Sequence, residues 1–157
     1  MTVSTPAPTR TPTPPRSRIS RQARQFGYLV AVAINAVMLY VANRLLEWEW
    51  PAFLTQDFDQ VLPIVQASLI AGVVINLAYV WFDAPWFKSV GQIVISAIGL
   101  AVAVRMFTVF PFDFSRYDFA WDTVARAVIV VAMIGSALAI VVETLKLFRT
   151  GLRTMFE

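Results

Sequence analysis

One stretch decides the fold of this chain: VLPIVQASLIAGVVINLAYVWF, residues 61–82. It contains no charged side chain, and its length matches the roughly 20 residues that a helix needs to cross about 30 Å of hydrocarbon. Pro63 stands in its opening turn, where the missing N–H removes no hydrogen bond. We therefore predict a transmembrane helix at 61–82.

Three further stretches resemble 61–82 in length and hydropathy. Together they predict spans at about 26–46, 61–82, 90–110 and 123–145. Pro51 follows the first span and Pro111 the third, and each is expected to stop a helix. The second and third spans are so close in sequence that they must form an antiparallel hairpin. The predicted fold is an all-α integral membrane protein, an antiparallel four-helix transmembrane bundle with a disordered N-terminal tail.

The composition agrees with a membrane environment. Of the 157 residues, 58% are hydrophobic and 15% are charged, whereas an ordinary soluble domain has about 45–50% apolar and about 25% charged residues. A soluble domain of this size could not bury so much apolar surface in one core. Acyl chains are the better solvent for this chain.

Both ends of the chain are polar. Residues 1–25 are rich in Thr, Pro, Ser and Arg, which predicts a disordered basic tail. Residues 149–157 form a short second basic tail, so the transmembrane domain comprises residues 26–148. We interpret the arginines just before the first span as a topogenic anchor, with regulation by phosphorylation of the tail as the alternative. These arginines are Arg16, Arg18, Arg21 and Arg24.

The distribution of positive charge predicts the orientation. With the N-terminus in the cytoplasm, nine Lys and Arg residues lie on the cytoplasmic side and four lie in or near the external loops. This is the positive-inside pattern, so both termini are expected in the cytoplasm. Arginine outnumbers lysine by 11 to 2, which is typical of a GC-rich bacterial genome. We therefore expect the chain in the plasma or inner membrane of a bacterial cell.

The absence of cysteine and histidine excludes several kinds of chemistry. This chain alone cannot form a disulfide, a Cys/His zinc site, a His-ligated haem or a Ser–His or Cys–His nucleophilic centre. It also contains no Gly-rich phosphate loop and no basic-aromatic surface for nucleic acid. We expect no enzyme activity, no cofactor, no metal site and no nucleic-acid partner.

Three arginines are predicted at similar depth, near the outer ends of three spans. They are Arg44, Arg105 and Arg126. Charges at this depth suggest a binding site, and arginine forks match the phosphate of a lipid headgroup or the carboxylate of an anionic solute. The alternative is that the side chains snorkel to water or form ion pairs. The candidate ion-pair partners are Glu47, Asp113 and Asp122.

Five further polar side chains lie inside the predicted spans. They are Asn35, Gln66, Asn76, Gln92 and Glu143. Intramembrane amides commonly form hydrogen bonds between helices, and small residues at four-residue spacing accompany them, so close helix packing is one interpretation. The other is a polar path lined by Asn35, Asn76 and Gln92. We expect Glu143 to pair with Lys146 or to reach the cytoplasmic interface.

The segment between the third and fourth spans is unusually aromatic for an external loop, which predicts a place in the headgroup region or against a partner. Because no catalytic motif is present, we interpret the chain as a non-enzymatic accessory or interaction subunit of a membrane complex, or as a homo-oligomer. The bilayer itself, including anionic lipids, is an expected partner. The alternative is a small oligomeric channel or transporter for an ion or small solute, with the arginine cluster at its outer mouth.

Overall fold

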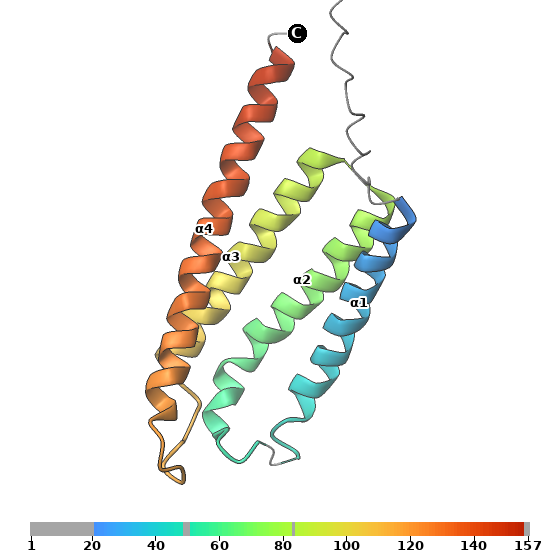
Figure 1. Ribbon diagram of the computed structural model, residues 1–157. Helices are drawn as coiled ribbons and strands as arrows, with labels where there is room; N and C mark the ends of the chain where they lie inside the picture. Colours follow the sequence, from blue (N-terminus) through green and yellow to red (C-terminus); the bar gives the residue numbers. More distant parts are fainter. Residues whose placement is uncertain (1–20, 49–50, 83, 156–157) are drawn as a thin grey trace, which may run out of the picture.

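The structure is all-helical. The computed structural model describes residues 21–48, 51–82 and 84–155 (Figure 1). Within these residues it contains the helices α1 (Arg21–Arg44), α2 (Leu62–Trp81), α3 (Pro85–Val109) and α4 (Trp121–Met155), and the short 3-10 helix η1 (Gln56–Gln60). Of the disordered tail predicted for residues 1–25, residues 1–20 lie outside the described residues, and residues 21–25 are helical as part of α1.

All four α-helices are long and apolar enough to cross a membrane, which indicates a multi-pass membrane protein, as predicted. Their ends differ from the predicted spans by a few residues. Helix α1 includes Arg21, the first described residue, because nothing in residues 21–25 breaks a helix. Helix α3 begins at Pro85, which suits a first helical turn. Helix α4 has 35 residues, about 52 Å at 1.5 Å per residue, and so exceeds what the hydrocarbon requires.

Pro63 and Pro111 mark helix boundaries as predicted, whereas α1 ends at Arg44, before Pro51. Pro63 and Pro85 stand in the first turns of α2 and α3. At the end of α3, Phe110 adopts a left-handed backbone with φ of 45° and donates its N–H to the carbonyl of Met106 at 2.9 Å. A non-glycine residue in this conformation costs about 1–2 kcal/mol. Its surroundings must hold it there, and the Pro111 that follows is fully buried.

The helices lie side by side in chain order (Figure 1). Helix α1 packs on α2, α2 on α3 and α3 on α4, while in the described part of the chain the backbone of α1 approaches neither α3 nor α4. The bundle is therefore open, with α1 and α4 as its two flanks. The α1–α2 and α3–α4 loops lie at one end, which we call the capped end, and the α2–α3 connection lies at the other (Figure 1). We call the latter the basic end, because Arg21, Lys88 and Arg149 lie there.

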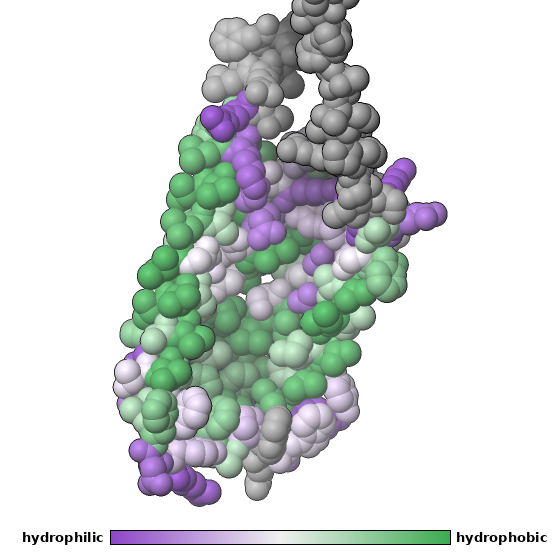
Figure 2. Space-filling view, in the orientation of Figure 1, coloured by the Kyte–Doolittle hydropathy of each residue, from purple (hydrophilic) through white to green (hydrophobic). Residues whose placement is uncertain are grey.

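Burial is concentrated at the capped end, whereas the helices expose most of their apolar side chains. Val61 and Pro111 are fully buried. By contrast, none of the most apolar stretch of α4 is buried, and Val131, Leu138 and Leu145 recur on one exposed face of that helix. Figure 2 shows hydrophobic surface along α4, with hydrophilic residues gathered toward the two ends. Acyl chains are the solvent that such a surface requires.

Candidate functional site

The capped end is built by pairing the α1–α2 loop with the α3–α4 loop. Leu54 and Phe112 form an isolated antiparallel β-bridge. Two backbone hydrogen bonds flank the bridge: Thr55 N–H to Pro111 O at 3.0 Å, and Asp113 N–H to Phe53 O at 2.8 Å. The bridge satisfies backbone groups of both loops, and it fixes the two helical hairpins to each other at this end.

Phenylalanine rings from both loops pack together around the bridge. The Phe53 ring centroid lies 5.2 Å from that of Phe114 and 6.2 Å from that of Phe112. Phe110 continues the cluster, 5.4 Å from Phe112. Such ring pairs each contribute about 0.5–1.5 kcal/mol beyond area burial. We call Phe53, Phe110, Phe112 and Phe114 the aromatic cap.

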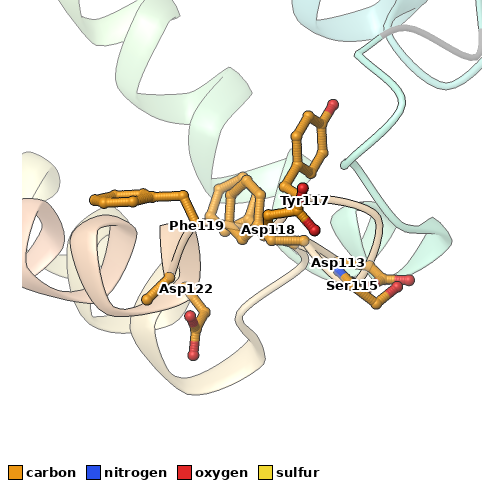
Figure 3. A pocket seen from close by; sticks show the side chains of 9 residues that line it. Asp113, Ser115, Tyr117, Asp118, Phe119 and Asp122 are labelled. Atoms are coloured by element: carbon orange, nitrogen blue, oxygen red, sulfur yellow. Dashed lines mark hydrogen bonds between the residues drawn. The ribbon is translucent and has the colours of Figure 1, made fainter.

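Two hollows open beside the aromatic cap. The first, about 400 Å³, is lined by Phe53, Phe114, Tyr117 and Trp121. The second, about 610 Å³, is formed by the 112–122 segment and carries three carboxylates (Figure 3). Around them, Phe119 is 60% exposed and Trp121 is 45% exposed. The capped end therefore combines a packed aromatic centre with exposed aromatic edges.

The three carboxylates of the second hollow point in different directions (Figure 3). They belong to Asp113, Asp118 and Asp122. Among the residues described by the structure, no group of three or more Asp or Glu side chains could hold a metal ion. Asp113 instead accepts the backbone N–H of Ser115 at 2.9 Å. This bond, the Ser115 hydroxyl and the charge of Arg116 hold the pKa of Asp113 below its ordinary value.

Each of the three candidate arginines has a local partner of its own. Arg44 forms an ion pair with Glu47, as predicted from their spacing. The Arg105 Nε donates to the Gln60 carbonyl of η1 at 3.4 Å. The guanidinium of Arg126 lies 3.8 Å from the centroid of the Phe110 ring. The three side chains thus contact three different segments of the chain.

The carboxylates expected beside Arg105 and Arg126 take other positions. Asp113 is held by Ser115, and Asp122 lines the second hollow. Over residues 21–48, 51–82 and 84–149, no ion pair joins Asp122 to Arg126. The left-handed turn at the end of α3 brings the Phe110 ring over Arg126 instead, and a cation–π contact takes the place of the ion pair.

Three of the intramembrane amides lie where α1 meets α2. The Asn76 Nδ2 donates to the Gly72 carbonyl at 2.7 Å, and a Cβ built on Gly72 would lie only 2.6 Å from the Asn35 Oδ1. Nearer the capped end, the Gln66 Nε2 donates to the Asn43 Oδ1 at 2.6 Å, which ties α2 to α1. Of these side chains, Gln66 bonds to the neighbouring helix and Asn35 lies against its backbone at Gly72.

The other two polar residues lie elsewhere. The Gln92 Nε2 is 3.4 Å from the Ser96 Oγ on the same helix, and Glu143 accepts from Lys146 at 2.5 Å, as expected from the sequence. Gln92 and Glu143 both line a cleft at the basic end. Asn35 and Asn76 are therefore placed at one helix contact and Gln92 at a different surface.

Neither protein-family models, nor curated proteins, nor solved structures give a match to this chain. Two parts of the molecular surface are distinctive: the aromatic cap with its exposed edges, and the cleft at the basic end.

Proposed function

We propose that this chain is a non-enzymatic membrane protein that functions by association, as an accessory subunit of a membrane complex or as a homo-oligomer. The observation that carries the proposal is the aromatic surface of the capped end, which a β-bridge between two loops holds in one arrangement. Exposed aromatic side chains around a packed centre are typical anchors of protein interfaces. Because backbone hydrogen bonds join the described parts of the two loops, docking would cost little conformational entropy.

The placement of the intramembrane amides favours association over the channel alternative. A solute path would need Asn35, Asn76 and Gln92 around one lumen. The Asn35 side chain instead lies against Gly72 at the contact between α1 and α2, and the side-chain N–H groups of Asn35 and Asn76 donate to backbone carbonyls of their own helices. These positions fit a packed helix contact better than a shared lumen.

We also propose that the four helices cross the membrane in alternating directions, with the basic end in the cytoplasm and the capped end outside. Supporting this orientation, Lys88, the start of α1 at Arg21 and Arg149 near the end of α4 lie at the basic end, and cytoplasmic segments carry the excess of positive charge. The bacterial plasma or inner membrane is the proposed location. A reporter fused after Glu157 should be active only in the cytoplasm, and activity outside the cell would refute this orientation.

Association is tested with two matched variants. Phe119→Ser removes an exposed ring beside the aromatic cap, and Phe148→Ser removes a ring of similar exposure, 67% against 60%, at the other end of the molecule. The full chain and both variants would be extracted from native membranes in mild detergent and examined by native mass spectrometry.

We expect the unaltered chain to carry a stoichiometric partner or further copies of itself. Phe119→Ser should weaken that association by about 2 kcal/mol, the size of an interface hot spot, whereas Phe148→Ser should retain it. A monomer without any partner, or equal retention by both variants, would contradict the proposed role of the capped end.

A further inference from the structure

The cleft at the basic end is lined by side chains from all four helices and has a volume of about 720 Å³. Tyr28 of α1 and Tyr79 of α2 form one wall, with ring centroids 5.4 Å apart. Helix α3 contributes Lys88 and Gln92, and α4 contributes the opposite wall. The cleft stays open because the backbones of α1 and α4 do not approach each other. Figure 2 shows hydrophilic residues in this hollow, toward the basic end.

The lining of the cleft changes with depth in the bundle. Charged groups form the rim at the basic end, and small or apolar residues of α4 form the deeper floor. The floor residues are Gly135, Leu138, Ala139 and Val142. From Gly135 to Lys146, α4 rises about 16 Å, about half of the 30 Å hydrocarbon core. The cleft is therefore one leaflet deep.

The rim carries two ammonium groups and one carboxylate. Lys146 Nζ lies 2.5 Å from Glu143 Oε1, and Lys88 Nζ lies 5.6 Å from the centroid of the Tyr28 ring. The Tyr79 hydroxyl donates to the Lys88 carbonyl at 3.0 Å, which fixes the first turn of α3. Among the described residues that line the cleft, the charged groups are the ammonium groups of Lys88 and Lys146 and the carboxylate of Glu143. An ammonium group has three N–H donors, so it can contact a phosphate while it keeps another partner.

We propose that this cleft binds one phospholipid of net negative charge from the leaflet at the basic end, with its phosphodiester at the rim and an acyl chain against the floor. The two ammonium groups at the rim can donate hydrogen bonds to the phosphodiester and attract the negative charge of such a lipid. The floor has room for an acyl chain, since a Cβ built on Gly135 meets no atom within 4 Å. A transmembrane helix of a partner would run the full height of the bundle, whereas the cleft ends near the midplane. The site is independent of the association proposed for the capped end.

The test uses the full chain, delipidated in detergent and titrated with phosphatidylglycerol, with binding counted by native mass spectrometry. The headgroup arm compares Lys88→Gln and Lys146→Gln with Arg149→Gln, which removes the same charge from the same end outside the cleft. The acyl arm compares Gly135→Leu, which fills the floor, with Gly27→Leu, whose added side chain also starts in open space.

Each lysine variant should lower the affinity for phosphatidylglycerol about fivefold, the contribution of one basic residue near a lipid surface. Gly135→Leu should also lower it, although the charge is unchanged, and the two control variants should bind as the unaltered chain does. An equal loss in Arg149→Gln, or equal binding of phosphatidylcholine, would overturn the proposal. Competition by inorganic phosphate together with full binding by Gly135→Leu would overturn it as well, because the ligand would then be a free anion.

Discussion

Replacing Gly91 by alanine should disturb the contact between α2 and α3. A Cβ at this position would lie 2.2 Å from the Tyr79 hydroxyl oxygen and 2.9 Å from Ile75 Cγ2, where carbon atoms normally keep about 3.5–4.0 Å. The Tyr79 side chain has little room to move, because the residue is 6% exposed and its ring packs against that of Phe87 at 5.8 Å. Its hydroxyl is also bonded to the Lys88 carbonyl.

The magnitude follows from three contributions. Forcing a methyl group into a packed contact costs about 1–3 kcal/mol, and the close approach to the Tyr79 hydroxyl places Gly91→Ala at the upper end of that range. Loss of the hydrogen bond from Tyr79 adds about 0.6 kcal/mol in a membrane protein. The higher helix propensity of alanine offsets about 1 kcal/mol. We expect a net destabilisation of about 2.5 kcal/mol.

The assay is unfolding of the purified protein by titration with a denaturing detergent, followed by tryptophan fluorescence. Gly27→Ala is the matched control, since its Cβ meets no atom within 4 Å. This variant should be more stable to unfolding by up to about 1 kcal/mol. Adding Tyr79→Phe to Gly91→Ala removes the nearest atom and should restore part of the loss. If Gly91→Ala is as stable as Gly27→Ala, then α2 and α3 do not pack tightly at Gly91, and the expected destabilisation is refuted.

Three further predictions concern the capped end. Leu54→Cys combined with Phe112→Cys should form a disulfide in intact cells, because paired residues of this bridge type have Cα atoms about 4.5 Å apart. A non-reducing gel detects the disulfide. The absence of a crosslink would contradict the bridge or its external location. Asp113 has a lowered pKa, so its ionised carboxylate should stabilise the loop fully at pH values above the ordinary carboxyl pKa. This stabilisation should disappear as the pH falls through the lowered pKa of Asp113. An NMR titration should show the Asp113 pKa rising in Ser115→Ala, and an unchanged value would contradict the role of the hydroxyl. Arg126→Gln should lower the free energy of unfolding by about 0.5–2 kcal/mol, because it removes the contact with Phe110. A double-mutant cycle with Phe110→Leu should show coupling between the two residues. If the contact contributes nothing, the losses of stability in the two single variants would simply add.

The helices were predictable because bilayer thickness sets their length. A span such as 61–82 is recognised from its hydropathy alone, and Pro63 and Pro111 mark helix boundaries through the geometry of their own rings. The bridge between Leu54 and Phe112 was not predictable in this way. It joins residues far apart in the sequence, and its register depends on how the two hairpins meet. The two aspartates beside Phe58 indicate an exposed acidic loop. In the structure Phe58 is only 5% exposed, because η1 turns its side chain inward.

For the polar residues, the sequence predicts depth but not direction around the helix. Arg105 and Arg126 could be assigned a depth from their distance to the span ends, but their partners depend on which way each helix faces. For Asn35 and Asn76 the sequence favours helix packing over a polar path, but it does not show that Asn35 lies against Gly72 of the neighbouring helix. The cleft at the basic end has no sequence signal of its own, since Tyr28 and Lys88 belong to different helices that only the packing brings together.

The open order of the four helices determines how copies of this chain can associate. Its two flanks, α1 and α4, are different surfaces and do not cover each other. When one flank meets its like, the contact is isologous and pairs two copies, and growth stops at that dimer when the other flank binds no further copy. When α1 of one copy meets α4 of the next, the contact is heterologous and every addition presents the same flank again, so the assembly either closes as a ring or continues as a row along the membrane.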